Sequence, residues 1–168
     1  INLFVGLFVG ITSGVTVVVS QFYGAKREKE LKRAVHTGIA LAMVLGIVLT
    51  AAVFALAGVM LRGMDTPAET MQQSETYLRI YACGMIGNML YNTGASILRA
   101  IGDSRRPFYY LVAGTLTNIV LDVVMVVFFK WGVAGAALAT IISQYVSAFC
   151  AFAYLLRTDA MVHVDLRE

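Results

Sequence analysis

The side chains with the clearest capacity for chemistry are an acid and an amide inside a long apolar run. The run covers residues 108–129, and Asp122 is its only acidic or basic residue. Asn118 lies four residues earlier and therefore on the same face of a helix. A carboxylate is expensive to bury in a membrane span, so such a residue is by default a functional-site hypothesis. The pair predicts a site that holds a small cation or carries a proton.

The elements that must position this pair are apolar helices. The 22 residues of the run would cover about 33 Å as a helix, enough to cross the hydrocarbon core of a bilayer. The sequence therefore predicts an all-α, polytopic membrane helix bundle over residues 1–156, and residues 157–168 are expected to be a cytoplasmic tail or linker. Five spans are expected, at residues 1–22, 34–61, 77–98, 108–129 and 133–156.

The composition agrees with a membrane protein and argues against several other classes. Hydrophobic residues make up 59% of the 168 residues, charged residues only 14%, and the mean hydropathy is +0.77. The basic residues lie between apolar spans rather than on one soluble face, so no nucleic-acid partner is expected. No phosphate loop, nucleophile elbow or paired carboxylate occurs within the spans, and we predict that the protein is not an enzyme. Cys83 and Cys150 are expected to be small buried apolar residues, with no disulfide or metal assigned.

The basic residues also predict the orientation of the spans. Ten of the thirteen lysines and arginines fall in the turn after the first span, the turn after the third span and the tail. Arg62, Arg79 and Lys130 fall on the opposite side. Cytoplasmic loops carry the excess of basic residues, so the turns at residues 26–33 and 102–107 are predicted to be cytoplasmic. Ile1 already lies inside an apolar stretch, and we expect the chain to be a fragment.

Other polar residues in the spans are weaker candidates. Asn88 and Asn92 lie at helical spacing in the third span, where interhelical hydrogen bonding and ion ligation are about equally plausible roles. Thr140, in the fifth span, belongs to a stripe with Gly132, Ala136 and Gln144, and taken alone it is better explained by close helix packing.

Three ordered motifs resemble the multidrug and toxic compound extrusion (MATE) family. They are Asn118-Ile-Val-Leu-Asp122, the preceding Ile-Leu-Arg-Ala-Ile-Gly-Asp at residues 97–103, and the following Gly-Val-Ala-Gly-Ala-Ala-Leu-Ala-Thr at residues 132–140. The stretch from Gly14 to Ala25 is also similar to the second helix of that family. The resemblance covers essentially the whole chain.

The resemblance implies a fold, a function and a site. Family members have two six-helix lobes and exchange Na⁺ or H⁺ for organic, often cationic, drugs, so this chain would hold helices two to six of the N-terminal lobe. A cation site in that lobe would use Asp122, Asn118, Asn92 and Thr140. The coupling ion would be the only cofactor-like species. The first helix, with a further acid, and the C-terminal lobe would be partners outside this sequence, as would membrane lipid.

The expected function is therefore that of a cation-coupled antiporter in the cell membrane, such as a prokaryotic inner membrane, which exports organic compounds. Two alternatives remain open at this point. One is a flippase for lipid-linked precursors, within the wider superfamily. The other is a membrane scaffold subunit with no transport cycle.

Overall fold

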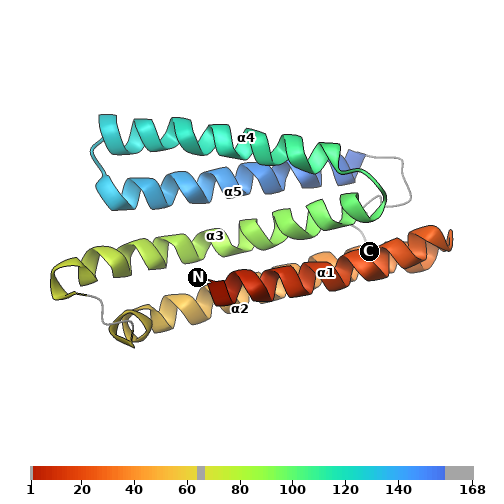
Figure 1. Cartoon of the computed structure of the whole chain (residues 1–168), viewed down its shortest axis with the longest axis horizontal. Helices are drawn as coiled ribbons and strands as arrows, with labels where there is room; N and C mark the ends of the chain where they lie inside the picture. The colour runs from red at the N-terminus through yellow and green to blue at the C-terminus, as the bar shows by residue number, and fades with distance from the viewer. Residues whose placement is uncertain (1, 64–66, 158–168) are drawn as a thin grey trace.

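The computed structural model describes residues 2–63 and 67–157, which form five long α-helices and one π-helical segment (Figure 1). No strand occurs in these ranges, and the predicted all-α fold is confirmed. The elements are α1 (Asn2–Gly24), α2 (Glu28–Gly63), α3 (Ala68–Ala100), α4 (Arg105–Asp122), η1 (Val123–Phe128) and α5 (Gly132–Arg157). The expected tail lies, apart from Arg157, outside the described residues.

Two helices are longer than the spans expected from hydropathy. Helix α2 begins at Glu28 instead of residue 34, and α3 begins at Ala68 instead of residue 77. Both extensions are polar and acidic in the first turn, where negative side chains complement the positive end of the helix dipole. Among the described residues, three helical segments are long and apolar enough to cross a membrane: α2, α4 continued by η1, and α5.

The turns at one end of the bundle depend on left-handed backbone conformations. Lys26 has a φ of 54° after the end of α1, and Gly102 has a φ of 88° after the end of α3. At the second turn the Asp103 N–H donates to the Leu98 carbonyl at 2.9 Å and so ends α3. This ending needs a left-handed residue, which glycine supplies without strain. Asp103 Oδ1 then accepts a hydrogen bond from the Arg106 N–H at 3.2 Å, which satisfies a free donor at the start of α4.

Helix α3 lies in the middle of the bundle. It packs against α1 and α2 on one side and against α5 on the other, while α4 packs chiefly on α5 (Figure 1). The two basic turns, between α1 and α2 and between α3 and α4, lie at the same end of the bundle, on the right in Figure 1. Both turns can therefore face the cytoplasm together, as their excess of lysines and arginines predicts.

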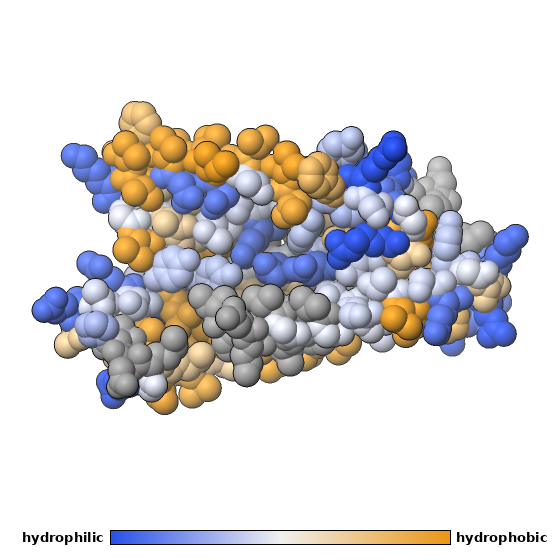
Figure 2. All heavy atoms as spheres, in the orientation of Figure 1, coloured by the Kyte–Doolittle hydropathy of each residue, from blue (hydrophilic) through white to orange (hydrophobic). Residues whose placement is uncertain are grey.

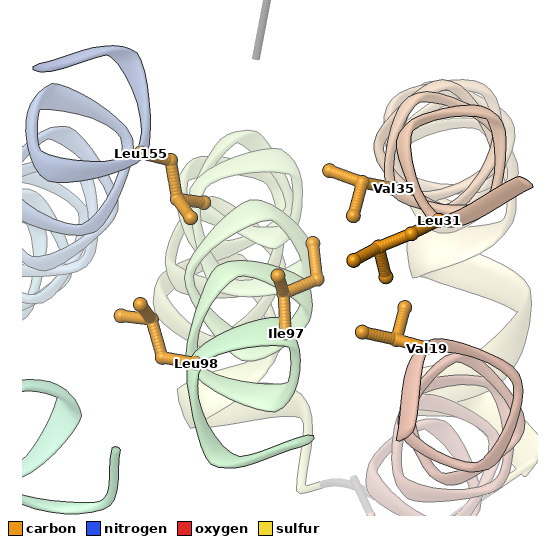
Figure 3. Packing of buried hydrophobic residues seen from close by; sticks show 6 residues of the cluster. All are labelled: Val19, Leu31, Val35, Ile97, Leu98 and Leu155. Atoms are coloured by element: carbon orange, nitrogen blue, oxygen red, sulfur yellow. The ribbon is translucent and has the colours of Figure 1, made fainter. Parts of the chain in front are cut away.

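A cluster of fully buried apolar side chains joins four helices near that end. Ile97 of α3 faces α1 and α2, whereas its neighbour Leu98 faces α5 (Figure 3). The members of this cluster are Val19, Leu31, Val35, Ile97, Leu98 and Leu155. In lipid, helices associate through close van der Waals packing, so the contacts of this cluster hold α3 at the centre of the bundle.

The outer surface is apolar where lipid would contact it. Residues of α4 and η1 are strongly exposed, among them Leu116, Val120 and Phe128. Figure 2 shows hydrophobic atoms along the α4 edge and hydrophilic residues at both ends of the molecule. One expectation was wrong: Cys83 is exposed, because α3 presents that position to the outside of the bundle, and Cys150 is only partly buried.

Candidate cation site and the adjoining cavity

The cavity next to the predicted site exists because α4 leans on α5 and makes little contact with α3. Gly114 of α4 allows this approach, since a Cβ there would overlap Ser147 Oγ and lie 3.0 Å from the Ser143 carbonyl oxygen. Ser147 Oγ donates to the Tyr110 carbonyl of α4 at 3.1 Å and so joins the two helices. The absence of a side chain at position 114 therefore sets the distance between α4 and α5.

Between α3, α4 and α5 lies a cavity of about 330 Å³. Its lining carries amides and hydroxyls from all three helices and no acidic or basic side chain. The lining residues are Asn88, Tyr91, Asn92, Leu111, Gly114, Thr115, Asn118, Thr140, Ser143, Gln144 and Ser147. Three of the four predicted site residues are therefore brought to one cavity: Asn92, Asn118 and Thr140.

Asn92 is held in place by the other asparagine of its stripe. Its Nδ2 donates to Asn88 Oδ1 and to the Asn88 carbonyl oxygen, both at 2.8 Å. Because these contacts use the amide nitrogen, the Asn92 Oδ1 is left as the ligand that this residue can offer to a cation or a donor.

Thr140 is oriented by its own helix. Its Oγ1 donates to the Ala136 carbonyl at 2.9 Å, so the lone pairs of the hydroxyl oxygen remain available as acceptors. The hydroxyl can serve as a neutral ligand without giving up its hydrogen bond. The same contact is also the common back-bond of a packed helical threonine, so it does not distinguish ligation from packing.

Asp122 lies at the edge of this arrangement. It is the last residue of α4, one turn beyond Asn118, and it does not line the cavity. The residue is partly buried, and its Oδ1 is fully buried without a hydrogen-bond partner among the described residues. A buried carboxylate oxygen without a partner in the protein is satisfied by a proton, a cation or a water molecule, because its isolation is costly.

Directly after Asp122 the helix changes character. Residues Val123–Phe128 form a π-helical segment, in which hydrogen bonds span one residue more than in an α-helix. The Phe129 N–H donates to the Val124 carbonyl at 3.0 Å as part of this pattern. π-Helical segments occur frequently at functional sites, and this one begins at the carboxylate.

The sequence did not single out Gln144 as a site residue. Gln144 lines the cavity from α5, and its Oε1 is buried without a partner in the described part of the chain. Asn118 Nδ2 is in the same condition. The only sequence signal for Gln144 was its place in a stripe with Gly132, Ala136 and Thr140, which suited helix packing equally well.

The donor set suits a monovalent ion or a proton. The one carboxylate, Asp122, lies one turn from a cavity whose lining carries neutral amides and hydroxyls, and hard cations take oxygen ligands of these kinds. Within residues 2–63 and 67–157, no group of three or more His, Cys, Asp or Glu side chains could hold a metal ion. A multivalent metal at the predicted site would have only one negatively charged ligand, the carboxylate of Asp122.

Comparison with known proteins identifies a single family. The family model MatE matches residues 1–124. "Probable multidrug resistance protein YoeA" from Bacillus subtilis is 36% identical over 156 residues, which cover 89% of this chain and 33% of that protein. "Probable multidrug resistance protein NorM" from Thermotoga maritima is 30% identical over 138 residues, which cover 79% of this chain and 30% of that protein. The chain spans about a third of the length of these relatives.

Solved structures give the same result in three dimensions. The inward-facing conformation of a multidrug resistance MATE family transporter matches 96% of this chain and 37% of its own, with a TM-score of 0.89 and 28% identity. The outward-facing conformation of a multidrug resistance MATE family transporter matches 97% of this chain and 36% of its own, with a TM-score of 0.88 and 28% identity. The fold is thus that of about a third of a transporter, and it fits both conformations equally well.

Proposed function

We propose that this chain, which belongs to the MatE family, forms part of the N-terminal lobe of an antiporter that exports organic, often cationic, compounds in exchange for Na⁺ or H⁺. The apolar helices and the transporter relatives make it a multi-pass membrane protein. The coupling ion would bind at Asp122, with neutral oxygens of Asn118, Asn92 and Thr140 in support. A prokaryotic inner membrane is the proposed location.

The observation that carries this proposal is the unpartnered Oδ1 of Asp122, buried next to a polar cavity. No basic side chain is paired with Asp122; the ion pairs of the described residues join Arg79 to Glu75 and Arg106 to Asp103. An intramembrane acid without a fixed basic partner is suited to exchange protons or cations, because either one can neutralise it in turn. The ion and the proton then compete for one carboxylate.

Coupling would follow from differential binding. A lobe that binds its ion better in one conformation of the whole transporter shifts the equilibrium toward that conformation. The nearly equal match to inward- and outward-facing structures supports a lobe that keeps its internal packing while the transporter changes state. The changes in access would then arise mainly between the two lobes.

The partners in this scheme are membrane lipid, the transported compounds and the remaining parts of the transporter. Those parts are a first helix with its own acid and a C-terminal lobe, which would close the substrate path. Nucleic acid has no role. These 168 residues by themselves are expected not to transport, since they span about a third of the length of the transporter relatives.

The proposal is tested with the full-length protein in liposomes. Ethidium trapped inside should leave when a Na⁺ or a proton gradient of the correct sign is imposed, and leave slowly without a gradient. Flux of a lipid-linked sugar, with no gradient-driven flux of ethidium, would support the flippase instead. The absence of flux for both substrates would support a scaffold.

A further inference from the structure

A second hollow, a groove of about 500 Å³, runs between α1 and α2. None of its lining residues belongs to the cavity between α3, α4 and α5, so the groove is a separate feature. The lining residues are Gly10, Gly14, Val15, Val18 and Phe22 of α1, and Glu30, Arg33, Ala34, Thr37, Gly38 and Leu41 of α2.

The floor of the groove is tightly packed, whereas its outer side is open. A Cβ at Gly38 would lie 3.0 Å from Val15 Cγ1, so the two helices are in contact there. A Cβ at Gly14, in contrast, would meet no side chain and no neighbouring helix within 4 Å. Val18 beside it is exposed. The described part of the chain therefore leaves an apolar surface uncovered along this groove.

The groove has about the length of one leaflet of a bilayer. From Gly10 to Phe22, α1 rises by about 18 Å, and from Glu30 to Leu41, α2 rises by about 17 Å. Half of the hydrocarbon core of a bilayer is about 15 Å thick. A lipid chain therefore fits the groove from end to end, whereas a membrane-spanning helix would extend well beyond it.

The two charged residues of the lining lie together at one end. Glu30 and Arg33 are three residues apart at the start of α2, on the same helical face, and both are exposed. Neither takes part in the ion pairs of the described residues. The rest of the lining carries no charge. The groove thus offers an apolar channel with one negative and one positive group at its end.

This pairing of charges selects among lipid headgroups. The guanidinium of Arg33 suits the phosphate of any phospholipid, because it binds phosphate oxygens in a fork. The carboxylate of Glu30 repels an anionic headgroup but accepts hydrogen bonds from a primary ammonium. Phosphatidylethanolamine supplies both groups, whereas the ammonium of phosphatidylcholine has no N–H. The other basic residues of the turn attract anionic lipid without lining the groove; they are Lys26, Arg27, Lys29 and Lys32.

We propose that the groove between α1 and α2 binds phosphatidylethanolamine. One acyl chain lies along Val15 and Val18, the phosphate contacts Arg33, and the ammonium donates to Glu30. The lipid belongs to the leaflet at the end of the bundle that carries the two basic turns (Figure 1). The assignment goes beyond the proposed function and does not rest on it, because none of these residues takes part in the proposed ion site.

Native mass spectrometry of the purified full-length protein tests the headgroup. The protein is released from micelles that hold equal amounts of phosphatidylethanolamine, phosphatidylcholine and phosphatidylglycerol with identical acyl chains, and the retained lipid is identified by its mass. Phosphatidylethanolamine should be retained about threefold more than either of the others, as expected for one exposed charged contact. Equal retention of the three lipids, or a preference for either of the other two, would overturn the assignment.

Substitutions at the charged end separate the two contacts. Glu30→Gln leaves Arg33 as the only charge of the lining, so the preference should change to the anionic phosphatidylglycerol. Arg33→Gln should lower the retention of all three lipids, since each carries a phosphate. Glu28→Gln and Arg27→Gln alter exposed residues of the same turn outside the lining, and as matched controls they should leave the preference unchanged. An unchanged preference in Glu30→Gln would overturn the ammonium contact and with it the choice of lipid.

A substitution in the apolar part tests the groove itself. Gly14→Leu places a side chain where no neighbour has to move, so the protein should fold but retain little lipid. Gly6→Leu is the matched control, because it lies on the same helix, outside the lining and in equally open surroundings. It should retain lipid as the unmodified protein does. Full retention by Gly14→Leu would overturn the proposed groove.

Another helix of the full-length protein is the alternative occupant. In that case the unmodified protein would retain no lipid selectively and Gly14→Leu would lower its melting temperature, a result that would also overturn the proposal. If Gly14→Leu does not fold, the change of preference in Glu30→Gln still decides the question. Loss of selective lipid retention would leave gradient-driven ethidium export untouched as evidence for the antiporter, so the two proposals fail separately.

Discussion

The Asn118 amide connects the carboxylate of Asp122 with the polar cavity. Asn118 lines the cavity and lies one turn before Asp122 on α4. Its nitrogen is buried without a hydrogen-bond partner among the described residues. If a cation binds at Asp122 as proposed, it would change the hydrogen bonding of an amide that belongs to the cavity lining.

The first residue-scale prediction concerns Asp122. Asp122→Asn removes the charge and the titratable proton while nearly preserving shape, so gradient-driven ethidium export by the full-length protein should be lost. Expression and membrane insertion should persist, because a neutral amide costs less to bury than a carboxylate. Asp122→Glu should retain partial coupling. The measurement is ethidium flux in liposomes under an imposed Na⁺ or proton gradient.

Asp103→Asn serves as the control for this experiment. Asp103 pairs with Arg106 at 2.8 Å in the turn before α4, away from the apolar part of the span. Its loss should leave gradient coupling intact. If the Asp122→Asn variant still exported ethidium at the full gradient-driven rate, the coupling site would have to lie outside this lobe.

The sequence indicated the polar residues within the spans better than it indicated how the fold groups them. Asp122 stood out because a single acid in 22 apolar residues is a strong signal. Its separation from the cavity lining could not be predicted, because that depends on how far α4 is shifted along α5. Gln144 was missed for a related reason: a polar residue on a small-residue stripe gives no indication of whether its amide finds a partner.

At the scale of elements, the closeness of α4 to α5 determines the shape of the cavity. Gly114→Ala should force the two helices apart, because the new methyl group would meet Ser147 Oγ and the Ser143 carbonyl oxygen. Overpacking of this kind costs about 1–3 kcal/mol. The melting temperature of the purified protein in detergent should fall by several degrees.

Two further variants make this prediction specific. Gly58→Ala in α2 is the matched control, since the nearest atom to a Cβ there is Glu75 Oε1 at an ordinary 3.5 Å. It should leave the melting temperature unchanged or raise it, because alanine favours helix over glycine. Gly114→Ala with Ser147→Ala should recover part of the loss. A stable Gly114→Ala variant would mean that α4 and α5 are not in firm contact.

The number and order of the helices could be predicted, but the start of α2 and one irregularity could not. The polar first turn of α2, from Glu28, has no hydropathy signal, although it continues the helix without a break. The π-helical segment at Val123–Phe128 consists of Val, Met and Phe alone and contains no glycine or proline to indicate a change. The altered hydrogen bonding there follows from tertiary packing rather than from local propensity.

At the scale of the whole molecule, the orientation in the membrane is the first testable property. Ala25 and Ser104 are exposed in the two basic turns, which lie at the same end of the bundle (Figure 1). Single cysteines placed there in a protein free of Cys83 and Cys150 should be shielded from an impermeant thiol reagent added to intact cells. A cysteine at Trp131, at the opposite end, should react and is the positive control. Labelling of both turns from outside would show that the topology is the inverse of the predicted one.

The second molecular property is rigidity of the lobe. Gly94 and Ala151 face each other between α3 and α5, where a Cβ at position 94 would lie 3.3 Å from the Ala151 Cβ. That separation is close to the range that a disulfide requires. Gly94→Cys with Ala151→Cys, in the same cysteine-free background, should form a disulfide on oxidation. Ethidium export should continue, because the two helices are expected not to move relative to each other.

Each single cysteine variant controls for the effect of oxidation itself. Reducing agent should leave the activity of the double variant unchanged. If oxidation stopped export and reduction restored it, the transport cycle would require motion within this lobe as well as between lobes.

Only Phe129, Lys130 and Trp131 separate η1 from α5, and this has a consequence for biosynthesis. So short a connection requires the two apolar segments to leave the ribosome and enter the bilayer as one hairpin. Asp122 would otherwise face lipid alone while the rest of the chain was still being made. In the hairpin, α5 already lies beside it, so the growing chain supplies a polar neighbour before the lobe is complete. Lengthening the connection should therefore delay or reverse insertion of α4 in cells, even where the finished protein could accommodate the extra residues.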